Sequence, residues 1–303
     1  MSRIAITGST GLLGEALGAS LTEDGHTVVR VVRDATDLGD DSVLWNPAAG
    51  EIDASGLEGV DAVVHLAAAP IRGTRWPPAQ VQRRQIYESR VVGTTLLAKT
   101  LAGLSEPPGV FVSASAVGYY GDRGDEVLTE DSGPGDDFLA EACAAWEGST
   151  KPAASAGIRT VLARTGVVIA DGGPLIDKVK IPFKLGVGGR VGDGRQYVPW
   201  ISLHDHVQAM RMLLDSELSG PVNLVAPEPV TNAELTRAIG SVVRRPTVMP
   251  IPLVMMRLLY GEIGEMLAAT SARVVPRRLL DAGFTYSVTD IREALAIALD
   301  RAA

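Results

Sequence analysis

A short glycine turn near the start of the chain has the residue types and spacing to hold a phosphate group. Residues 7–14, "TGSTGLLG", follow a short apolar run and open a helical pattern. Gly8 permits a tight turn, Gly11 lets the backbone approach a pyrophosphate, and Gly14 lets the helix pack closely on a sheet. The turn therefore predicts a dinucleotide site at a helix N-terminus, although a plain structural turn could use the same glycines. The expected cofactor contacts are Gly8, Ser9, Thr10, Gly11, Leu12, Leu13 and Gly14.

The end of the second apolar run bears on which dinucleotide binds. It reads "VVRD", about twenty residues after the glycine turn, and ends in Arg33 followed by Asp34. An acidic residue there would bond the ribose 2′-hydroxyl of NAD, whereas an arginine would pair with the 2′-phosphate of NADP. Because Arg33 is nearer to the strand end, we expect NADP, with NAD as the alternative. A solvated charge at a strand end is the structural interpretation of Arg33.

A third apolar run ends in small side chains. In "DAVVHLAAAP", residues 61–70, Leu66, Ala67 and Ala68 follow the run and leave room for a cofactor that crosses the sheet. His65 lies within the apolar run and is interpreted as a core residue. A fourth run, "GVFVSAS", ends with Ser113 and Ser115, of which Ser113 is also expected beside the cofactor.

Composition limits the classes of function. The chain has 303 residues, 46% of them apolar, and a formal net charge of −8 at pH 7, which argues against a nucleic-acid partner. The single cysteine, Cys143, fits a reducing compartment, and no secretory signal is visible, so we expect a cytoplasmic protein. The most apolar late stretch, "VMPIPLVMMRLLYG", is too short to span a bilayer, and Met255 and Met256 within it are expected in the core. We expect a small-molecule substrate and no membrane partner; the oligomeric state stays open.

Alternating patterns predict the elements that would position these residues. Short Val-, Ile-, Thr- and Ala-rich runs predict strands near residues 3–8, 27–32, 61–67, 109–115 and 159–165. Helical spacing lies between them, at residues 11–25, 81–103 and 136–157. This order predicts an α/β fold, a Rossmann-type doubly wound parallel sheet with helices on both faces.

The alternation of strand and helix patterns ends after residue 171, which predicts a boundary between two domains. Residues 1–171 are expected to form the dinucleotide-binding domain, with a return segment at about 201–226 that includes a helix starting near Asp205 and the strand "PVNLVA". Residues 172–200 and 227–303 are expected to form a smaller, mostly helical substrate domain. Asp205 is interpreted as the N-cap of its helix.

Several of these stretches resemble a known family. "TGSTGLLG", "DAVVHLAA", "VSASAVGYYG" and "NLVAPEPVTNAEL" resemble the extended short-chain dehydrogenase/reductase superfamily, which includes sugar-nucleotide epimerases and dehydratases. "RWPPAQVQRRQIYESRVVGT", "DFLAEACAAWE", "GRVGDGRQYVPWISLHDHV" and "VVPRRLLDAGF" look like one little-characterised branch, the epimerase-family proteins, which carry a C-terminal domain of unassigned role. The resemblance covers nearly the whole chain.

The resemblance implies a serine and a Tyr-x-x-x-Lys pair, and this chain departs from the second part. Ser115 falls on the serine position, but the tyrosine and lysine positions fall on Phe138 and Ala142. Phenylalanine cannot transfer a proton, and alanine carries no charge that would lower a pKa. No tyrosine occurs between Gly121 and Gly173, so a shift of register does not restore the pair.

Three explanations remain open. Another acid could act, with Tyr119, Tyr120 or Glu141 as candidates, although a packed turn would also explain the tyrosines. Ser115 is a catalytic candidate because it falls on the serine position of the superfamily. The substrate could instead need no strong protein acid, as when an activated double bond is reduced. The third explanation is a protein that binds NADP without turnover.

The second domain offers candidate substrate contacts. "FKLGVGGRVGDGRQYVPW", residues 183–200, has flexible glycines, arginines for an anion, and polar and stacking side chains, although a surface loop could have the same composition. In the first domain, Arg90 stands on a predicted helix at a position where the superfamily usually has asparagine. It could pair with a carboxylate or phosphate, or it could be an exposed charge on the helix. The expected substrate-binding residues are Arg90, Arg190, Arg195, Gln196 and Trp200. His204 and His206 have no partner cluster, so no metal site is expected.

The sequence thus predicts an NADP-preferring oxidoreductase or epimerase-like enzyme that acts on a small polar or nucleotide-linked substrate. The alternative is a catalytically silent NADP-binding redox sensor or scaffold, which Phe138 and Ala142 favour.

Overall fold

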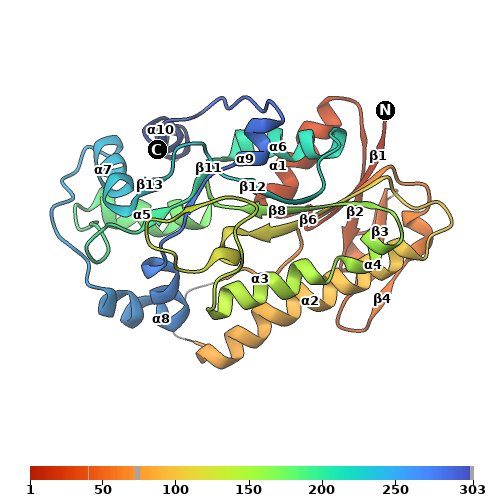
Figure 1. Cartoon of the computed structure of the whole chain (residues 1–303), viewed down its shortest axis with the longest axis horizontal. Helices are drawn as coiled ribbons and strands as arrows, with labels where there is room; N and C mark the ends of the chain where they lie inside the picture. The colour runs from red at the N-terminus through yellow and green to blue at the C-terminus, as the bar shows by residue number, and fades with distance from the viewer. Residues whose placement is uncertain (40, 72–75, 301–303) are drawn as a thin grey trace.

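The protein is built around a twisted, mostly parallel sheet, seen edge-on in Figure 1. The computed structural model describes residues 1–39, 41–71 and 76–300. All neighbours in the sheet are parallel except the last pair, β3 and β4, which is antiparallel. The strands in spatial order are β12 (Gly220–Leu224), β8 (Arg159–Thr165), β6 (Val110–Ala116), β5 (Ala62–His65), β1 (Arg3–Thr7), β2 (Thr27–Val32), β3 (Ser42–Asn46) and β4 (Glu51–Ile52).

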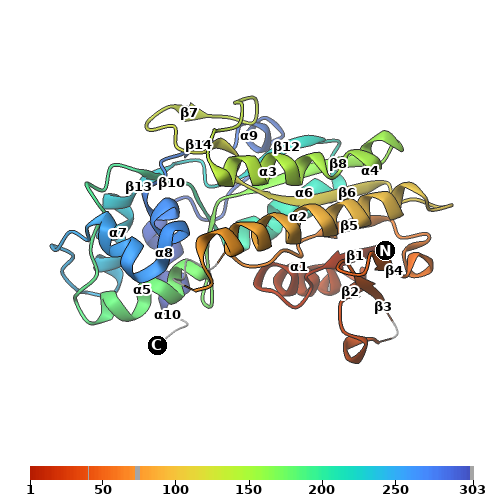
Figure 2. The same cartoon turned by 90° about the horizontal axis from the view of Figure 1, so that it is seen from below.

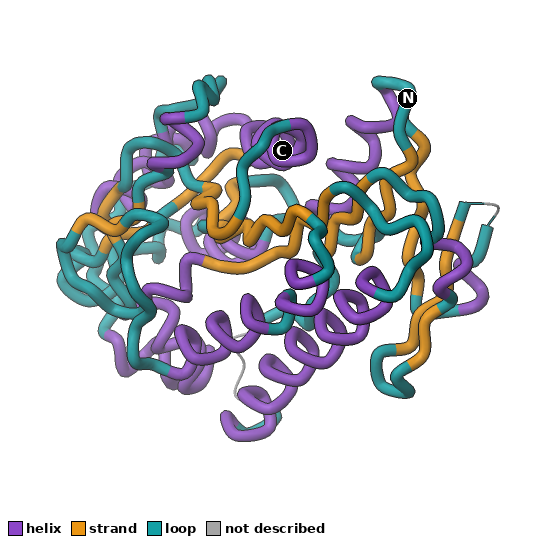
Figure 3. The backbone as a smooth tube through the Cα atoms, turned by 45° about the vertical axis from the view of Figure 1, so that its right-hand side comes forward, coloured by secondary structure: helices purple, strands orange, loops and turns teal. Residues whose placement is uncertain are grey.

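Helices cover both faces of this sheet, as Figures 1 and 3 show. One face packs against α1 (Leu12–Glu23) and α6 (Leu203–Asp215), and the other against α2 (Ala79–Ala102), α3 (Phe138–Gly148) and α4 (Lys151–Ser155). Alternate residues of β1 serve the two cores, because Ile4 and Ile6 join one and Ala5 joins the other. The predicted Rossmann-type α/β fold is confirmed.

The strand order places a switch point beside the glycine turn. β1 lies between β2 and β5, so the crossovers that leave β1 and β5 run in opposite directions from the middle of the sheet. In open α/β sheets a ligand binds at such a point, outside the carboxyl ends of the strands. Thr7 and His65, the last residues of β1 and β5, are paired across this point.

Local structure differs from the sequence expectations in three places. The strands β3 and β4 were not expected. The helix predicted over residues 136–157 is two helices, because the chain turns at Ser149 and Thr150 and Pro152 lies in the first turn of α4. The helix predicted near Asp205 starts at Leu203, with Ser202 as its N-cap. The Asp205 carboxylate instead accepts hydrogen bonds from the Ser202 hydroxyl and the backbone amides of residues 287 and 288.

The rest of the chain forms a second, mostly helical region at one end of the sheet (Figure 2). Its core joins α5, α7 and α10 through Ile176, Leu235 and Leu295. Residues 273–286 return to the main sheet, where Leu279 packs in the core beside β12. The elements are β7 (Val127–Leu128), β9 (Val167–Ile169), α5 (Pro174–Lys184), β10 (Tyr197–Val198), β11 (Trp200–Ser202), β13 (Val230–Thr231), α7 (Asn232–Val242), α8 (Leu253–Ala269), β14 (Arg273–Val274), α9 (Arg277–Asp281) and α10 (Ile291–Asp300). Short 3-10 turns are η1 (Ala35–Asp37), η2 (Ala54–Leu57) and η3 (Val117–Tyr120).

Helix α8 buries only two of its 17 residues, Ile263 and Gly264. It kinks at Gly261, whose φ is 73°, so residues 253–260 form a separate first segment. Most side chains of this segment are exposed, and Met255 is 40% exposed, so the expectation that it lies in the core is wrong. Within the described residues, no helix has the length and apolar content needed to cross a bilayer.

Candidate functional site

The glycine turn joins β1 to α1 in the geometry that the sequence predicts. Gly8 has a φ of 69°, and a Cβ there would lie 2.9 Å from the Ala67 nitrogen. A Cβ at Gly14 would lie 2.2 Å from the Gly8 carbonyl oxygen, so the packing of the protein itself requires glycine at both positions. At Gly11 a Cβ would lie 3.4 Å from that oxygen, an ordinary contact. Internal packing therefore does not require glycine at residue 11.

The N-terminus of α1 carries free donors. Gly11 is the N-cap, and no side chain caps the helix. The first amide that bonds back along the helix is that of Glu15, which donates to the Gly11 carbonyl at 2.8 Å. The N–H groups of Leu12, Leu13 and Gly14 precede it and have no acceptor within the helix. Thr10 and Gly11 are exposed, so an anion can reach this end, where the helix dipole stabilises negative charge.

Thr7 joins the glycine turn to the loop after β5. Its buried hydroxyl oxygen accepts hydrogen bonds from the Leu66 and Ala67 amides, both at 3.1 Å. With two amides donating to it, the hydroxyl donates its own proton to Nδ1 of His65, 2.7 Å away. Leu66 and Ala67, both half-buried, are thereby held beside Gly8, and the half-buried Ala68 follows them.

His65 continues this network into the helices. Because Nδ1 accepts from Thr7, Nε2 carries the proton and donates to the Thr94 hydroxyl of α2, 2.9 Å away. Trp146 of α3 donates its Nε1–H to the same Thr94 oxygen at 2.9 Å. Burial lowers the pKa of His65 to about 4, so the ring is neutral near pH 7. His65 is thus a core residue with every polar atom paired, consistent with its interpretation from sequence.

Arg90 lies inside α2 beside this network and is buried. One guanidinium nitrogen, Nη1, donates to the carbonyls of Ala69 and Ile86 at 3.2 and 3.1 Å. The guanidinium carbon lies 5.0 Å from the centre of the Trp146 ring. These contacts connect the end of the loop after β5 to α2 and α3. The Arg90 guanidinium is therefore engaged within the protein through Nη1 and the Trp146 ring.

Arg33 and Asp34 lie where β2 ends, next to the glycine turn. Thr7 is paired with Val31 of β2, so Arg33 follows at the same carboxyl edge. The Asp34 carboxylate accepts hydrogen bonds from the amide and the hydroxyl of Thr36, at 2.9 and 2.8 Å, and these bonds lower its pKa. Arg33 is exposed and forms no ion pair within the described residues.

The catalytic candidate Ser115 belongs to a buried ion pair. Glu147 of α3 and Arg164 of β8 form a bidentate pair at 2.8 and 2.9 Å, with side chains 9% and 4% exposed. Ser115 and Arg164 are register partners in neighbouring strands. The Ser115 hydroxyl donates to the same Glu147 carboxylate at 2.7 Å. Its proton is therefore directed into the protein, and Ser113, also fully buried, bonds only within its own strand.

The two tyrosines have different surroundings. Tyr120 is fully buried; its hydroxyl donates to the Asn223 side chain at 2.7 Å and accepts from Arg164 at 3.0 Å. Burial raises the pKa of Tyr120 to about 12, which opposes proton release near pH 7. Tyr119 is half-buried, and its ring lies under the Arg164 guanidinium, 3.5 Å from carbon to ring centre. Its hydroxyl forms no hydrogen bond within the described residues.

The positions of the missing Tyr-x-x-x-Lys pair are apolar in space as well as in sequence. Phe138 is the first residue of α3, and the Arg83 guanidinium lies 5.1 Å from its ring centre. Ala142, one turn further along, is buried.

Residues 183–200, which were predicted to hold substrate contacts, are more ordered than expected. Its glycines pack against neighbours: a Cβ at Gly189 would lie within 1.7 Å of the Met249 carbonyl oxygen, and one at Gly188 would overlap the Phe183 ring. The Ile251 amide donates to the Arg190 carbonyl at 2.7 Å, which holds this segment against the start of α8. Gly188 and Gly189 therefore allow close packing, whereas a Cβ at Gly186 would meet nothing within 4 Å.

The four predicted contacts in this segment divide into two pairs. Arg190 and Arg195 are exposed, and the nearest carboxylate to Arg195 is that of Asp193, 3.9 Å away. Gln196 donates its amide to the carbonyls of Val191 and Ala268, and Trp200 is 1% exposed within the core of the second region. The structure thus leaves only the two arginines open to a ligand.

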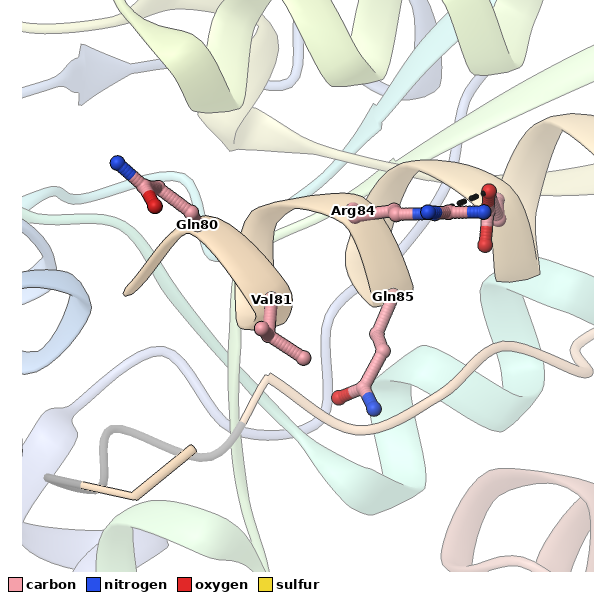
Figure 4. A pocket seen from close by; sticks show the side chains of 5 residues that line it. Gln80, Val81, Arg84 and Gln85 are labelled. Atoms are coloured by element: carbon pink, nitrogen blue, oxygen red, sulfur yellow. Dashed lines mark hydrogen bonds and ion pairs between the residues drawn. The ribbon is translucent and has the colours of Figure 1, made fainter. Parts of the chain in front are cut away.

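A hollow of about 450 Å³ lies along the first half of α2 (Figure 4). Its described lining comes from one helix and includes the exposed Arg84–Glu88 ion pair. None of the predicted site residues lines it, so we do not assign it to the cofactor or the substrate. Among the described residues, no group of three or more potential metal ligands occurs. The lining residues are Gln80, Val81, Arg84, Gln85 and Glu88.

The sequence did not single out the residues that brace this site. Thr7 and Thr94 are ordinary strand and helix residues by pattern, and Glu147 and Arg164 are 17 residues apart in different elements. The one available signal was a charged residue at the inner end of a predicted strand, Arg164 in "RTVLART", since a charged residue that is buried there needs a partner.

Comparison with curated proteins finds relatives over the full length of the chain. An epimerase family protein of Mycobacterium tuberculosis, MT2273, is 42% identical over 299 residues, 98% of both chains. The human epimerase family protein SDR39U1 is 33% identical over 300 residues, which cover 97% of this chain and 98% of the relative. An epimerase family protein of Bacillus subtilis, YfhF, is 32% identical over 297 residues, 97% of this chain and 96% of the relative.

Solved structures share the fold. The structure of human SDR39U1 (isoform 2) with NADPH has a TM-score of 0.89 and 32% identity, and the match covers 98% of this chain and 99% of that one. A nucleoside-diphosphate sugar epimerase of Corynebacterium glutamicum has a TM-score of 0.79 and 37% identity, with 98% of this chain matching 58% of that one.

Two family models divide the chain. The model described as a domain of unknown function, DUF1731, matches residues 251–298, which begin just before α8. The other matches residues 4–225, from the middle of β1 to the end of β12, and so includes the whole main sheet and the glycine turn. The chain belongs to the NAD dependent epimerase/dehydratase family.

Proposed function

We propose that this protein binds NADP at the glycine turn and acts as an oxidoreductase or epimerase-like enzyme on a small polar or nucleotide-linked substrate. The observation that carries the proposal is the glycine at residue 11, which internal packing does not require, at the uncapped start of α1. A relative 32% identical over nearly the whole chain has been solved with NADPH, which supports the same site here.

The side chains at the end of β2 support NADP over NAD. The Asp34 carboxylate is engaged by Thr36, whereas Arg33 has no carboxylate partner within the described residues. An unpaired guanidinium at this position complements the 2′-phosphate that distinguishes NADP.

Different residues of the chain would hold the cofactor and the substrate. The amides of Leu12, Leu13 and Gly14 would hold the pyrophosphate, and the loop braced by Thr7 would support the rest of the dinucleotide. When bound, the nicotinamide ring supplies or accepts a hydride. Arg190 and Arg195 would contact an anionic substrate from the second region.

Tyr119 is the side chain to which we assign proton transfer, if the reaction needs one from the protein. Ser115 donates into the Glu147 carboxylate, and Tyr120 is buried with its hydroxyl doubly bonded. The Tyr119 hydroxyl, by contrast, forms no hydrogen bond within the described residues, and its ring lies against the Arg164 guanidinium.

A second candidate function is supported by Phe138 and Ala142. Both positions of the usual catalytic pair are apolar. This supports a protein that binds NADP without turnover and acts as a redox sensor or scaffold.

The test measures NADPH and NADH binding and then turnover with NADPH over a panel of quinones, ketones and sugar nucleotides. We expect NADPH to bind at least about tenfold more tightly than NADH, and Arg33→Ala to abolish that preference. Arg30→Ala, an exposed arginine of the same strand, is the matched control and should keep it. A preference for NADH would overturn the choice of NADP. NADPH binding without turnover over the whole panel would select the sensor.

A further inference from the structure

The first segment of α8, residues 253–260, is apolar and largely exposed. It reads "LVMMRLLY", and its only charged residue is Arg257. Exposed side chains occur at residues 253, 254, 255, 258 and 259, which extend over more than half of the helix circumference. An apolar helix that is not buried needs another apolar environment, because a surface of this kind is uncommon on a protein with nothing bound to it.

The exposed apolar surface continues beyond α8. Arg245 donates a hydrogen bond to the Lys184 carbonyl at 3.0 Å, and the Lys178 ammonium lies 5.3 Å from the Tyr260 ring centre, so α5, the segment before α8 and α8 itself adjoin one another. Figure 2 shows α5 and α8 together at the end of the molecule away from the edge strand β4. We call residues 177–187 and 244–260 the α5/α8 face. Its most exposed apolar side chains, 52% to 86% exposed, are Ile181, Leu185, Val187, Val248, Met249, Val254, Leu258 and Leu259.

Basic residues surround these apolar side chains. The α5/α8 face holds six basic residues and one acidic residue, Asp177, in a chain whose formal net charge is −8. Lys184, Arg244 and Arg245 are exposed and form no ion pair within the described residues. The other basic residues of the face are Lys178, Lys180 and Arg257, of which Arg257 lies 3.7 Å from Glu265.

We propose that the α5/α8 face docks on an anionic lipid surface, with Val254 and Leu258 entering the headgroup region and Lys184 and Arg244 facing the lipid phosphates. Apolar side chains on an exposed helix with flanking Lys and Arg are what interfacial binding requires. A second copy of the chain fits less well, because two such faces would bring like charges together. The proposal does not depend on the cofactor or on turnover.

Charge removal tests the electrostatic part. Purified protein is sedimented with vesicles of phosphatidylcholine alone or mixed with phosphatidylglycerol. We expect binding to the mixed vesicles only, reduced by high salt. Lys184→Gln with Arg244→Gln should weaken binding about 30-fold, at about fivefold for each basic residue. Arg237→Gln with Arg292→Gln makes the same change of net charge outside the face and should bind like the wild type.

A second pair of variants tests the apolar part. Val254→Gln with Leu258→Gln should reduce vesicle binding at least about tenfold. Leu280→Gln with Ile297→Gln, at apolar side chains that are about half exposed outside the face, should not. NADPH affinity should be the same in all four variants, which separates this result from any failure of the proposed function. Equal binding of the wild type to both kinds of vesicle, or to neither, would overturn the proposal. So would a dimer that Val254→Gln with Leu258→Gln disrupts, or binding to polyglutamate as strong as to the mixed vesicles.

Discussion

The hydroxyl of Thr7 and Nδ1 of His65 lie 2.7 Å apart in the core, one residue before the glycine turn and one before the loop after β5. The Thr7 oxygen also accepts from the Leu66 and Ala67 amides. One hydroxyl therefore fixes both segments that would hold a dinucleotide. These hydrogen bonds lie within the protein, and they position the glycine turn and the loop after β5 as a cradle for the dinucleotide.

Replacing Thr7 by valine should loosen this cradle. Valine has nearly the shape of threonine but leaves the Ala67 amide and Nδ1 of His65 without their partner, whereas the Leu66 amide keeps its bond to the Thr7 carbonyl. Each unpaired buried group costs about 1–3 kcal/mol. We expect a loss of stability of about that size or more in urea denaturation, together with weaker NADPH binding. Thr22→Val is the control, because the Thr22 hydroxyl bonds only to the Gly18 carbonyl on the exposed side of α1. Equal effects of the two substitutions would contradict the role of Thr7.

The neutral state of His65 makes stability depend on pH. Burial lowers the pKa of His65 to about 4, and the pKa of the similarly buried His206 is also about 4, whereas an unfolded histidine titrates near 6.5. Between these values the unfolded chain binds more protons, so the free energy of unfolding falls as pH falls. The expected slope is up to about 1.4 kcal/mol per pH unit for each histidine.

Denaturation midpoints measured in steps from about pH 7 to about pH 4.5 check this slope. Nitrogen-15 NMR of the imidazoles checks its cause, because Nδ1 of His65 should be unprotonated and Nε2 protonated throughout. A stability that does not change over this range, or a His65 signal from the Nδ1-protonated form, would disagree with the network.

The buried pair of Glu147 and Arg164 should be more sensitive to the loss of one partner than of both. Glu147→Gln leaves the Arg164 guanidinium buried without its countercharge, which costs about 3–5 kcal/mol. Adding Arg164→Met removes the uncompensated charge and should recover part of that loss. Ser115→Ala removes one charge-assisted hydrogen bond and should cost about 1.5–3 kcal/mol. A double variant less stable than Glu147→Gln would show that the pair is not coupled in this way.

Tyr119 should affect turnover without affecting cofactor binding. If a substrate is found, Tyr119→Phe should lower kcat by about 100-fold or more, the usual effect of removing a general acid or base. NADPH affinity should stay the same, and Tyr87→Phe, an exposed tyrosine of α2, should have wild-type rates. A Tyr119→Phe enzyme with wild-type kcat would show that the proton comes from elsewhere.

The sequence predicts the sheet and the glycine turn because their signals are local. Gly8 needs its positive φ, Gly14 faces a carbonyl across one helical turn, and the strands β1, β2, β5, β6 and β8 are short apolar runs between helices. The break between α3 and α4 was also local, but helical spacing on both sides of Pro152 concealed it.

The hydrogen-bond network inside the site could not be predicted from local sequence patterns. Ser115 and Tyr120 match a family pattern in sequence, yet their hydroxyls bond to Glu147 and Asn223, which come from distant elements. Trp200 looked like a stacking surface because aromatic residues bind ligands and fill cores equally well, and only packing decides between the two. The exposure of residues 253–260 is likewise set by what the rest of the fold leaves uncovered.

NADPH titration of Gly11→Ala beside Gly18→Ala tests the central claim most directly. A Cβ meets only ordinary contacts at both positions, 3.4 Å from the Gly8 oxygen and 3.9 Å from Val28, so both variants should fold. Gly18→Ala should melt no lower than the wild type, because alanine is favoured over glycine inside a helix. Only residue 11 would meet the pyrophosphate, so Gly11→Ala should weaken NADPH binding at least about tenfold and Gly18→Ala should not change it. A wild-type protein without affinity for NADPH, or a Gly11→Ala variant that binds it normally, would contradict the account.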